Sequence, residues 1–118
     1  MKSLNTLDWA WLAGVFEGEA AFTFCGKYPR ISLGMTDEDI IARVADYFEV
    51  NYHLKKADKR NPVWKPMYQL HIIKTDVLIE CFLELFPFLG SRRREAITRF
   101  RDYWISKGMN VPEPHLMW

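Results

Sequence analysis

The chain has 118 residues, the size of a single domain, and its 49% of hydrophobic and 15% of aromatic residues are ample for a packed core. Its 16 basic and 15 acidic side chains leave a formal net charge of +1, which argues weakly against nucleic-acid binding. Its two isolated cysteines are too few for a disulfide framework or a zinc site.

The first expected element is a helix over Leu7–Gly18, with Thr6 or Asn5 as its cap. Small residues recur at every fourth position and share one helical face, at Ala10, Gly14 and Gly18. Another backbone can approach such a face closely, in a soluble core or between membrane helices. The apolar run is far shorter than the roughly 20 residues that span a bilayer, so we expect no membrane association.

Two carboxylates, Glu17 and Glu19, stand where this helix should end. A carboxylate is slightly unfavourable there, because the C-terminal end of a helix carries partial negative charge. A divalent metal ion would offset that charge; the plainer alternative is a pair of solvated side chains. We expect Glu17 to be structural, since it belongs to the helix and points away from Glu19.

After the first helix, the pattern of apolar and polar residues predicts four strands and a second helix. The segments Ala20–Gly26 and Arg30–Met35 alternate and predict a hairpin around a turn at residues 26–29. A helix then starts at Thr36 with acids in its first turn. The third and fourth strands are expected over residues 50–57 and 64–73, on either side of a polar loop.

Two further helices complete the chain. One begins at Thr75 and is ended by Pro87, and the other runs from Ser91 to Lys107 with Gly108 as its stop. The order helix-strand-strand-helix-strand-strand-helix-helix predicts an α+β fold with a saddle-like antiparallel sheet that carries helices on one face. We expect residues 1–110 to form the single domain and residues 111–118 an irregular tail.

The alternation also predicts which side chains occupy the free face of the sheet. They are polar or small, with one exception, and a concave antiparallel sheet that presents such groups can lie in the major groove of DNA. A solvated sheet face is the plainer alternative. The side chains predicted there are Thr23, Cys25, Lys27, Arg30, Ser32, His53, Lys55, Met67, Gln69 and His71.

Basic residues gather in two runs although the net charge is close to zero. One run spans residues 53–65 and the other residues 92–107, while acids concentrate elsewhere. A chain that is neutral overall can still present a basic face to a nucleic acid. Either run taken alone is also typical of ordinary solvated surface.

Residues 12–20, LAGVFEGEA, resemble the LAGLIDADG motif of homing endonucleases, with Leu12, Ala13 and Gly14 identical. The resemblance continues along most of the chain. Residues 31–37 look like the second strand of the family running into its next helix, and residues 87–94 look like its loop and basic patch before a late helix. The chain departs from the family at Glu19, where aspartate is more frequent, and at Ala20, where glycine is usual.

This resemblance implies a site-specific endonuclease that cleaves both strands of a long pseudo-palindromic DNA site and belongs to a mobile genetic element. A single copy of the motif implies a homodimer, with Ala10, Gly14 and Gly18 at the interface. The implied cofactor is Mg²⁺ or Mn²⁺, and no small-molecule cofactor is expected.

The resemblance also assigns roles to individual residues. Glu19 is the implied metal ligand, and Gly18 and Ala20 lend backbone carbonyls. Asp37 orients water near the scissile phosphate, or is simply an acid in the first turn of a helix. Arg92 stabilises transition-state charge, or anchors a phosphate as Arg93 and Arg94 do.

Two other functions fit the same residues. One is a non-cleaving DNA- or RNA-binding protein of this fold, a transcription regulator or an intron maturase, which a nuclease assay with Mg²⁺ distinguishes. The other is a small α+β dimer that binds no nucleic acid and is not retained on DNA or heparin at low salt. The absence of an apolar leader and the two lone cysteines predict an intracellular protein, in the cytoplasm, an organelle or a phage-infected cell, that is not secreted.

Overall fold

The computed structural model describes residues 1–55 and 66–114. Its elements follow one another in the order α1 (Thr6–Glu19), β1 (Ala20–Cys25), β2 (Tyr28–Met35), α2 (Glu38–Phe48), β3 (His53–Lys55), β4 (Met67–Ile72), α3 (Thr75–Leu85), the 3₁₀ turn η1 (Phe86–Phe88) and α4 (Ser91–Ser106). The predicted α+β order of helices and strands is therefore confirmed.

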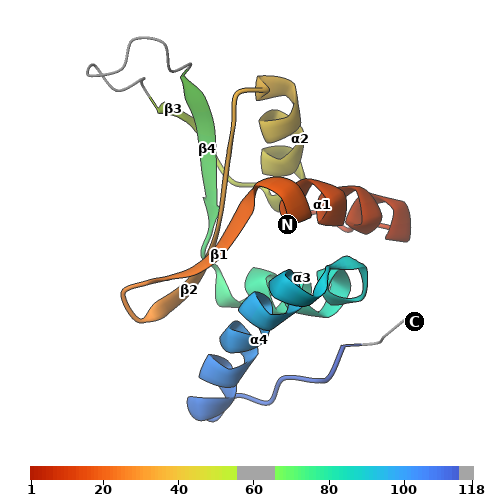
Figure 1. Ribbon diagram of the computed structural model, residues 1–118, viewed down its shortest axis with the longest axis vertical. Helices are drawn as coiled ribbons and strands as arrows, with labels where there is room; N and C mark the ends of the chain where they lie inside the picture. Colours follow the sequence, from red (N-terminus) through yellow and green to blue (C-terminus); the bar gives the residue numbers. More distant parts are fainter. Residues whose placement is uncertain (56–65, 115–118) are drawn as a thin grey trace.

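The sheet has four antiparallel strands in the order β1-β2-β4-β3. All the α-helices lie on one side of this sheet, and the other side is open (Figure 1). The apolar half of each alternating strand faces the helices, as Phe22, Ile31, Leu33, Leu70 and Ile72 are all buried. The sequence pattern thus separates a core face from a free face.

The first hairpin is tighter than predicted. The turn was expected to occupy residues 26–29, but β2 begins at Tyr28, which pairs with Cys25. Gly26 adopts a φ of 63°, a left-handed conformation that closes the turn within two residues. Pro29 consequently belongs to the strand, where it is buried.

The second pair of strands is shorter than predicted where the structure describes it. Residues 50–52 precede β3 instead of belonging to it, and β4 ends at Ile72. The remaining parts of the predicted strands, residues 56–57 and 64–65, lie outside the described residues.

An aromatic cluster joins the elements of the core. Phe16 of α1 stacks on Phe48 of α2 with ring centroids 6.0 Å apart, and its edge meets Phe22 of β1 at 6.5 Å. Phe22 in turn contacts Phe100 of α4 at 6.3 Å. Rings in these edge-to-face and offset arrangements contribute beyond the area that they bury. One cluster therefore fixes α1 and α4 against the start of β1.

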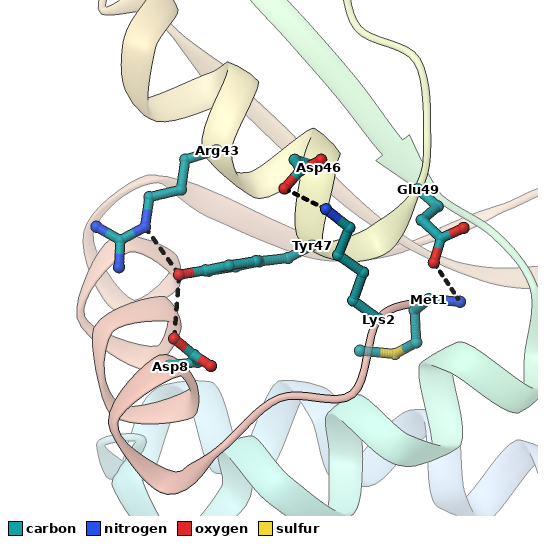
Figure 2. Close-up of polar contacts among 7 residues, drawn as sticks. All are labelled: Met1, Lys2, Asp8, Arg43, Asp46, Tyr47 and Glu49. Carbon is teal, nitrogen blue, oxygen red and sulfur yellow. Dashed lines mark hydrogen bonds and ion pairs between the residues drawn. The ribbon is translucent and has the colours of Figure 1, made fainter.

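Polar contacts around the first turn of α1 fix its position against α2 (Figure 2). Asn5 and Asp8 form a capping box at the helix start. Asp8 also accepts a hydrogen bond from the Tyr47 hydroxyl at 3.1 Å, and Arg43 donates to that hydroxyl at 2.9 Å. The Arg43 guanidinium lies 3.8 Å from the ring centroid of Trp11, in a cation–π contact.

The segment after α4 has no helix or strand over residues 109–114. It is nevertheless packed, because Val111 is only 5% exposed and joins the core, and Glu113 forms an ion pair with Arg101 at 2.7 Å. The division of the chain at residue 110 stays a prediction. Among the helices of the described residues, none is long and apolar enough to cross a membrane.

Candidate functional site

The outward face of α1 is apolar. Trp11 on it packs against Arg43 and Tyr47 of α2, whereas no other part of the described chain covers Gly14 and Gly18. Trp9, Leu12, Ala13 and Phe16 are buried on the inner side of this helix. On the outer side Gly14 and Gly18 are exposed, and a Cβ built at either one would meet no atom within 4 Å.

Large apolar side chains stand on the same outer face. Leu7 is 79% exposed, and Trp11 and Val15 are only partly buried. A helix that is apolar on every side is usually covered on every side. The predicted interface residues Gly14 and Gly18 therefore lie on a surface that a further molecule can cover.

Helix α1 ends at Glu19, whose side chain is exposed. Two residues earlier, the Glu17 carboxylate accepts a hydrogen bond from the backbone N–H of Gly90 at 3.1 Å. A Cβ at position 90 would lie 3.1 Å from that carboxylate, so a larger residue there would require the Glu17 side chain to shift slightly. Glu17 thus ties the end of α1 to the residue before α4, in the structural role expected for it.

Arg93 neutralises the C-terminal end of α1. Its Nε donates to the Glu17 carbonyl oxygen at 3.2 Å, its Nη1 donates to the Ala20 carbonyl oxygen, and its guanidinium lies over the Phe22 ring. A helix leaves its last carbonyl oxygens without partners and with partial negative charge, so a cation is stabilising there. Arg93 is therefore the cation at these carbonyl oxygens, and a metal ion at the Glu19 carboxylate stays a prediction.

The other two arginines of the triplet, Arg94 and Arg92, differ in their contacts. Arg94 donates from Nε to the Phe86 carbonyl oxygen at 3.0 Å and from Nη2 to the Pro87 carbonyl oxygen at 2.9 Å, which holds η1 against α4. Arg92 is exposed, and none of the contacts among residues 1–55 and 66–114 occupies its guanidinium. Of the three arginines, Arg92 is the one whose guanidinium is free of contacts within the described residues; the contacts of all three arginines with DNA stay predictions.

The structure brings Glu19 and the start of α4 together. Arg93 contacts the backbone on both sides of Glu19, so Arg92, its neighbour in the chain, belongs to the same end of the fold. Asp37 is further from the end of α1. It follows β2, four residues after Leu33, which is the residue opposite Ala20. It is the N-cap residue of α2, but its exposed carboxylate makes no capping hydrogen bond.

A complete metal site is not present in the described part of one chain. No group of three or more His, Cys, Asp or Glu side chains there could hold an ion. The Ala20 carbonyl, a predicted ligand, already accepts from the cationic Arg93. At the end of α1, the exposed Glu19 carboxylate is a hard oxygen donor that suits Mg²⁺, an ion that takes one or two carboxylates and keeps several waters. The binding of a metal ion by Glu19 stays a prediction.

The register places the predicted polar side chains together on the open face of the sheet. Directly opposite residues share a face, and Thr23 stands opposite Arg30, Ser32 opposite His71, His53 opposite Gln69, and Lys55 opposite Met67. Lys27 occupies the hairpin turn beside Cys25. Tyr28 is a further exposed side chain, absent from the predicted set, which stands opposite Cys25 and is 69% exposed because the tighter turn adds it to β2.

A serine and two histidines form a small cluster on this face. Ser32 Oγ lies 2.9 Å from His71 Nδ1, and the ring centroids of His53 and His71 are 5.9 Å apart. Partial burial lowers the pKa of His71 below its ordinary value of 6.5, and the charges of Arg30 and His53 lower it further. His71 is therefore neutral at physiological pH.

No family model matches the chain, and no curated protein matches it. Among solved structures, the homing endonuclease I-CvuI matches in two crystal structures of its DNA complexes. In complex with the I-CreI target and 2 mM Mg, with the DNA not cleaved, it gives a TM-score of 0.54 at 16% identity over 82% of this chain. In complex with its own target and 2 mM Ca it gives 0.53 at 15% identity over 83% of this chain.

The chain has the LAGLIDADG homing endonuclease fold. At this low identity the likeness is one of fold, and the chain spans 66% of the length of the I-CvuI chain in both comparisons. The resemblance first seen in residues 12–20 is thus confirmed for the architecture in which those residues are placed.

We expect Arg93→Met to lower the free energy of unfolding by roughly 1–3 kcal/mol, because two carbonyl oxygens at the α1–β1 junction lose their charged donor. The matched variant Arg92→Met, one residue earlier and exposed, should change it by less than about 0.5 kcal/mol. Urea unfolding of both variants measures the difference. Equal losses would contradict the structural role of Arg93.

We expect the His71 imidazole to titrate below pH 6.5 in the folded protein, because the fold favours its neutral form. The resulting stabilisation is present above pH 6.5 and is lost as the pH falls through the lowered pKa. Proton NMR of the imidazole CH groups measures the midpoint. A midpoint at or above 6.5 would show that burial does not act on His71.

Proposed function

We propose that this protein is a site-specific DNA endonuclease that cleaves both strands as a homodimer with a divalent metal ion. One observation carries the proposal. The outward glycine face of α1 leads directly to the exposed carboxylate of Glu19, on a fold shared with homing endonucleases that are bound to DNA.

The dimer follows from the surface of α1. Ala10, Gly14 and Gly18 let a second α1 approach closely, and the exposed Leu7 gains cover from it. A two-fold axis through this face makes the interface the same on both subunits. It also sets the two Glu19 carboxylates near each other, which completes the half-site that one chain provides.

The open sheet supports DNA as the substrate. Two such faces, side by side in a dimer, form a long surface that carries Lys27, Arg30 and Lys55 together with hydrogen-bonding side chains. An antiparallel ribbon fits the major groove, where cations contact phosphates and polar side chains read base edges. The two-fold symmetry of the protein predicts a long pseudo-palindromic target, as in an endonuclease of a mobile genetic element.

Each residue at the end of α1 has a proposed part in the reaction. Mg²⁺ or Mn²⁺, when bound, supplies an activated water and offsets the charge of the phosphate and of the leaving oxygen. Glu19 binds the ion, with the Gly18 carbonyl as a further candidate ligand and Ala20 as a weaker one. Arg92 holds the phosphate and stabilises charge on it, and Asp37 orients water.

A second candidate is favoured by one observation. Arg93 already neutralises the end of α1, so the fold does not require a metal ion there. A non-cleaving DNA- or RNA-binding protein of the same fold, such as a transcription regulator or an intron maturase, would keep the open sheet and the dimer. Incubation with a randomised duplex library and Mg²⁺ distinguishes the two, because only the endonuclease yields cut ends.

Glu19→Gln keeps the shape of the side chain and removes its charge, so we expect strand scission to be lost while DNA binding in Ca²⁺ remains. The matched control is Glu17→Gln, whose amide oxygen can still accept the hydrogen bond from Gly90 and which we expect to cut DNA. Cleavage is measured on a duplex selected by the wild type. A Glu19→Gln variant that cuts at the wild-type rate would exclude Glu19 as a metal ligand.

Substitutions of Gly14 test the proposed dimer interface without disturbing the fold of the single chain. Since a Cβ at this position meets nothing within 4 Å, Gly14→Ala and Gly14→Leu should both keep the monomer folded. The alanine variant should remain dimeric. Leucine should separate the two helices, since overpacking a close contact costs roughly 1–3 kcal/mol. Light scattering measures the oligomeric state of each variant, and thermal unfolding measures whether it is folded. A Gly14→Leu protein that stays fully dimeric would place the interface elsewhere.

A further inference from the structure

The Ser32–His71 pair lies in the middle of the open sheet face. Ser32 belongs to β2 and His71 to β4, the two central strands in the order β1-β2-β4-β3. The two residues are directly opposite in the register, both are half-buried, and Ser32 Oγ is 2.9 Å from His71 Nδ1. The histidine ring is therefore held by a neighbouring strand.

The surroundings of the pair bear on which nitrogen of His71 carries the proton. The 2.9 Å contact between Ser32 Oγ and His71 Nδ1 fits a hydrogen bond in either direction. On its other side Ser32 faces Ala21, so His71 is the cross-strand neighbour that can accept from the serine hydroxyl. The Arg30 guanidinium on β2 and the His53 ring on β3 both disfavour a positive charge on His71. A neutral imidazole has one donor and one acceptor nitrogen, so in the arrangement where Ser32 donates to Nδ1, Nε2 carries the hydrogen.

A donor at Nε2 has a definite preference among base edges. Nε2 is the ring nitrogen further from the backbone, and His71 belongs to the open face of the sheet. In the major groove guanine presents two adjacent acceptors, N7 and O6, and thymine presents one acceptor, O4, beside its methyl group. Adenine places an amino donor beside N7, and cytosine presents a donor. A single fixed N–H donor is therefore best matched by guanine.

We propose, resting on the DNA-cleaving function proposed above, that His71 is a specificity-determining residue whose Nε2–H donates to a guanine in the major groove, and that Ser32 is the positioning residue that fixes its tautomer. In a two-fold dimer the same contact occurs twice. The target then carries a guanine at equivalent positions of its two half-sites.

The tautomer is tested first, in the free protein. Imidazole ¹⁵N shifts, measured at neutral pH, should show His71 protonated at Nε2 in the wild type and in Ser32→Thr, which keeps a hydroxyl. Ser32→Ala should give a mixture of both tautomers, because the hydroxyl donor is lost. A wild-type His71 protonated at Nδ1 would overturn the proposal, whatever the protein does with DNA.

The base contact is tested by selection of bound sequences from a library of randomised duplexes, in Ca²⁺ to separate binding from cleavage. We expect the wild type to prefer guanine at one position of each half-site and His71→Ala to lose that preference by about tenfold at that position alone. Ser32→Ala should weaken the preference, and Ser32→Thr should restore it.

The outcomes separate the contact from the function on which it rests. A wild type that selects a definite sequence, with a preference pattern unchanged by His71→Ala, overturns the contact and leaves the proposed function standing. A wild type that selects no sequence at all overturns the proposed function together with the contact.

Discussion

The positive charge of Arg93 at the carbonyl end of α1 is the interaction on which the arrangement of the candidate site depends. Its guanidinium donates to carbonyl oxygens before and after Glu19, and so binds the end of α1, the start of β1 and the first turn of α4 into one unit. The Glu17 carboxylate, which accepts a hydrogen bond from the Gly90 N–H, also ties the end of α1 to the start of α4. Glu19 is exposed within this unit, and Arg92, the exposed residue before Arg93, belongs to the same first turn of α4.

The two sides of α1 are subject to different constraints. Its inner side fills the core with Phe16 and Leu12, and any change of volume there disturbs packing against the sheet. Its outer side carries glycines, which cost a helix about 1 kcal/mol each relative to alanine and gain nothing from contacts within the described chain. A second copy of the helix at close range is a partner that favours small side chains on this surface. The inner side of α1 thus stabilises the subunit, and its outer side is the proposed surface for assembly of the dimeric site.

Local patterns were sufficient to predict most of the fold. The spacing of small residues, the capping residues near Asn5 and the alternation in the first hairpin identify α1, β1 and β2, and the same alternation predicts which side chains share the open face. The roles of the three arginines could not be derived in this way. Consecutive helical residues point in directions about 100° apart, so which of Arg92, Arg93 and Arg94 reaches the α1–β1 junction depends on how α4 is rotated against it. That rotation is set by tertiary contacts such as those of Phe100. The placement of Glu19 is given by the structure, and its role, like those of Asp37 and Arg92, stays a prediction.

The proposed mechanism requires two copies of the chain to meet along α1 and to complete a site of which each holds half. The most direct measurement is the stoichiometry of the 14.0 kDa chain on a duplex that it cuts, determined by sedimentation equilibrium in Ca²⁺. The account predicts two chains on each duplex, related by the symmetry of the target. A single chain on a duplex that is then cleaved in both strands on addition of Mg²⁺ would contradict the shared site.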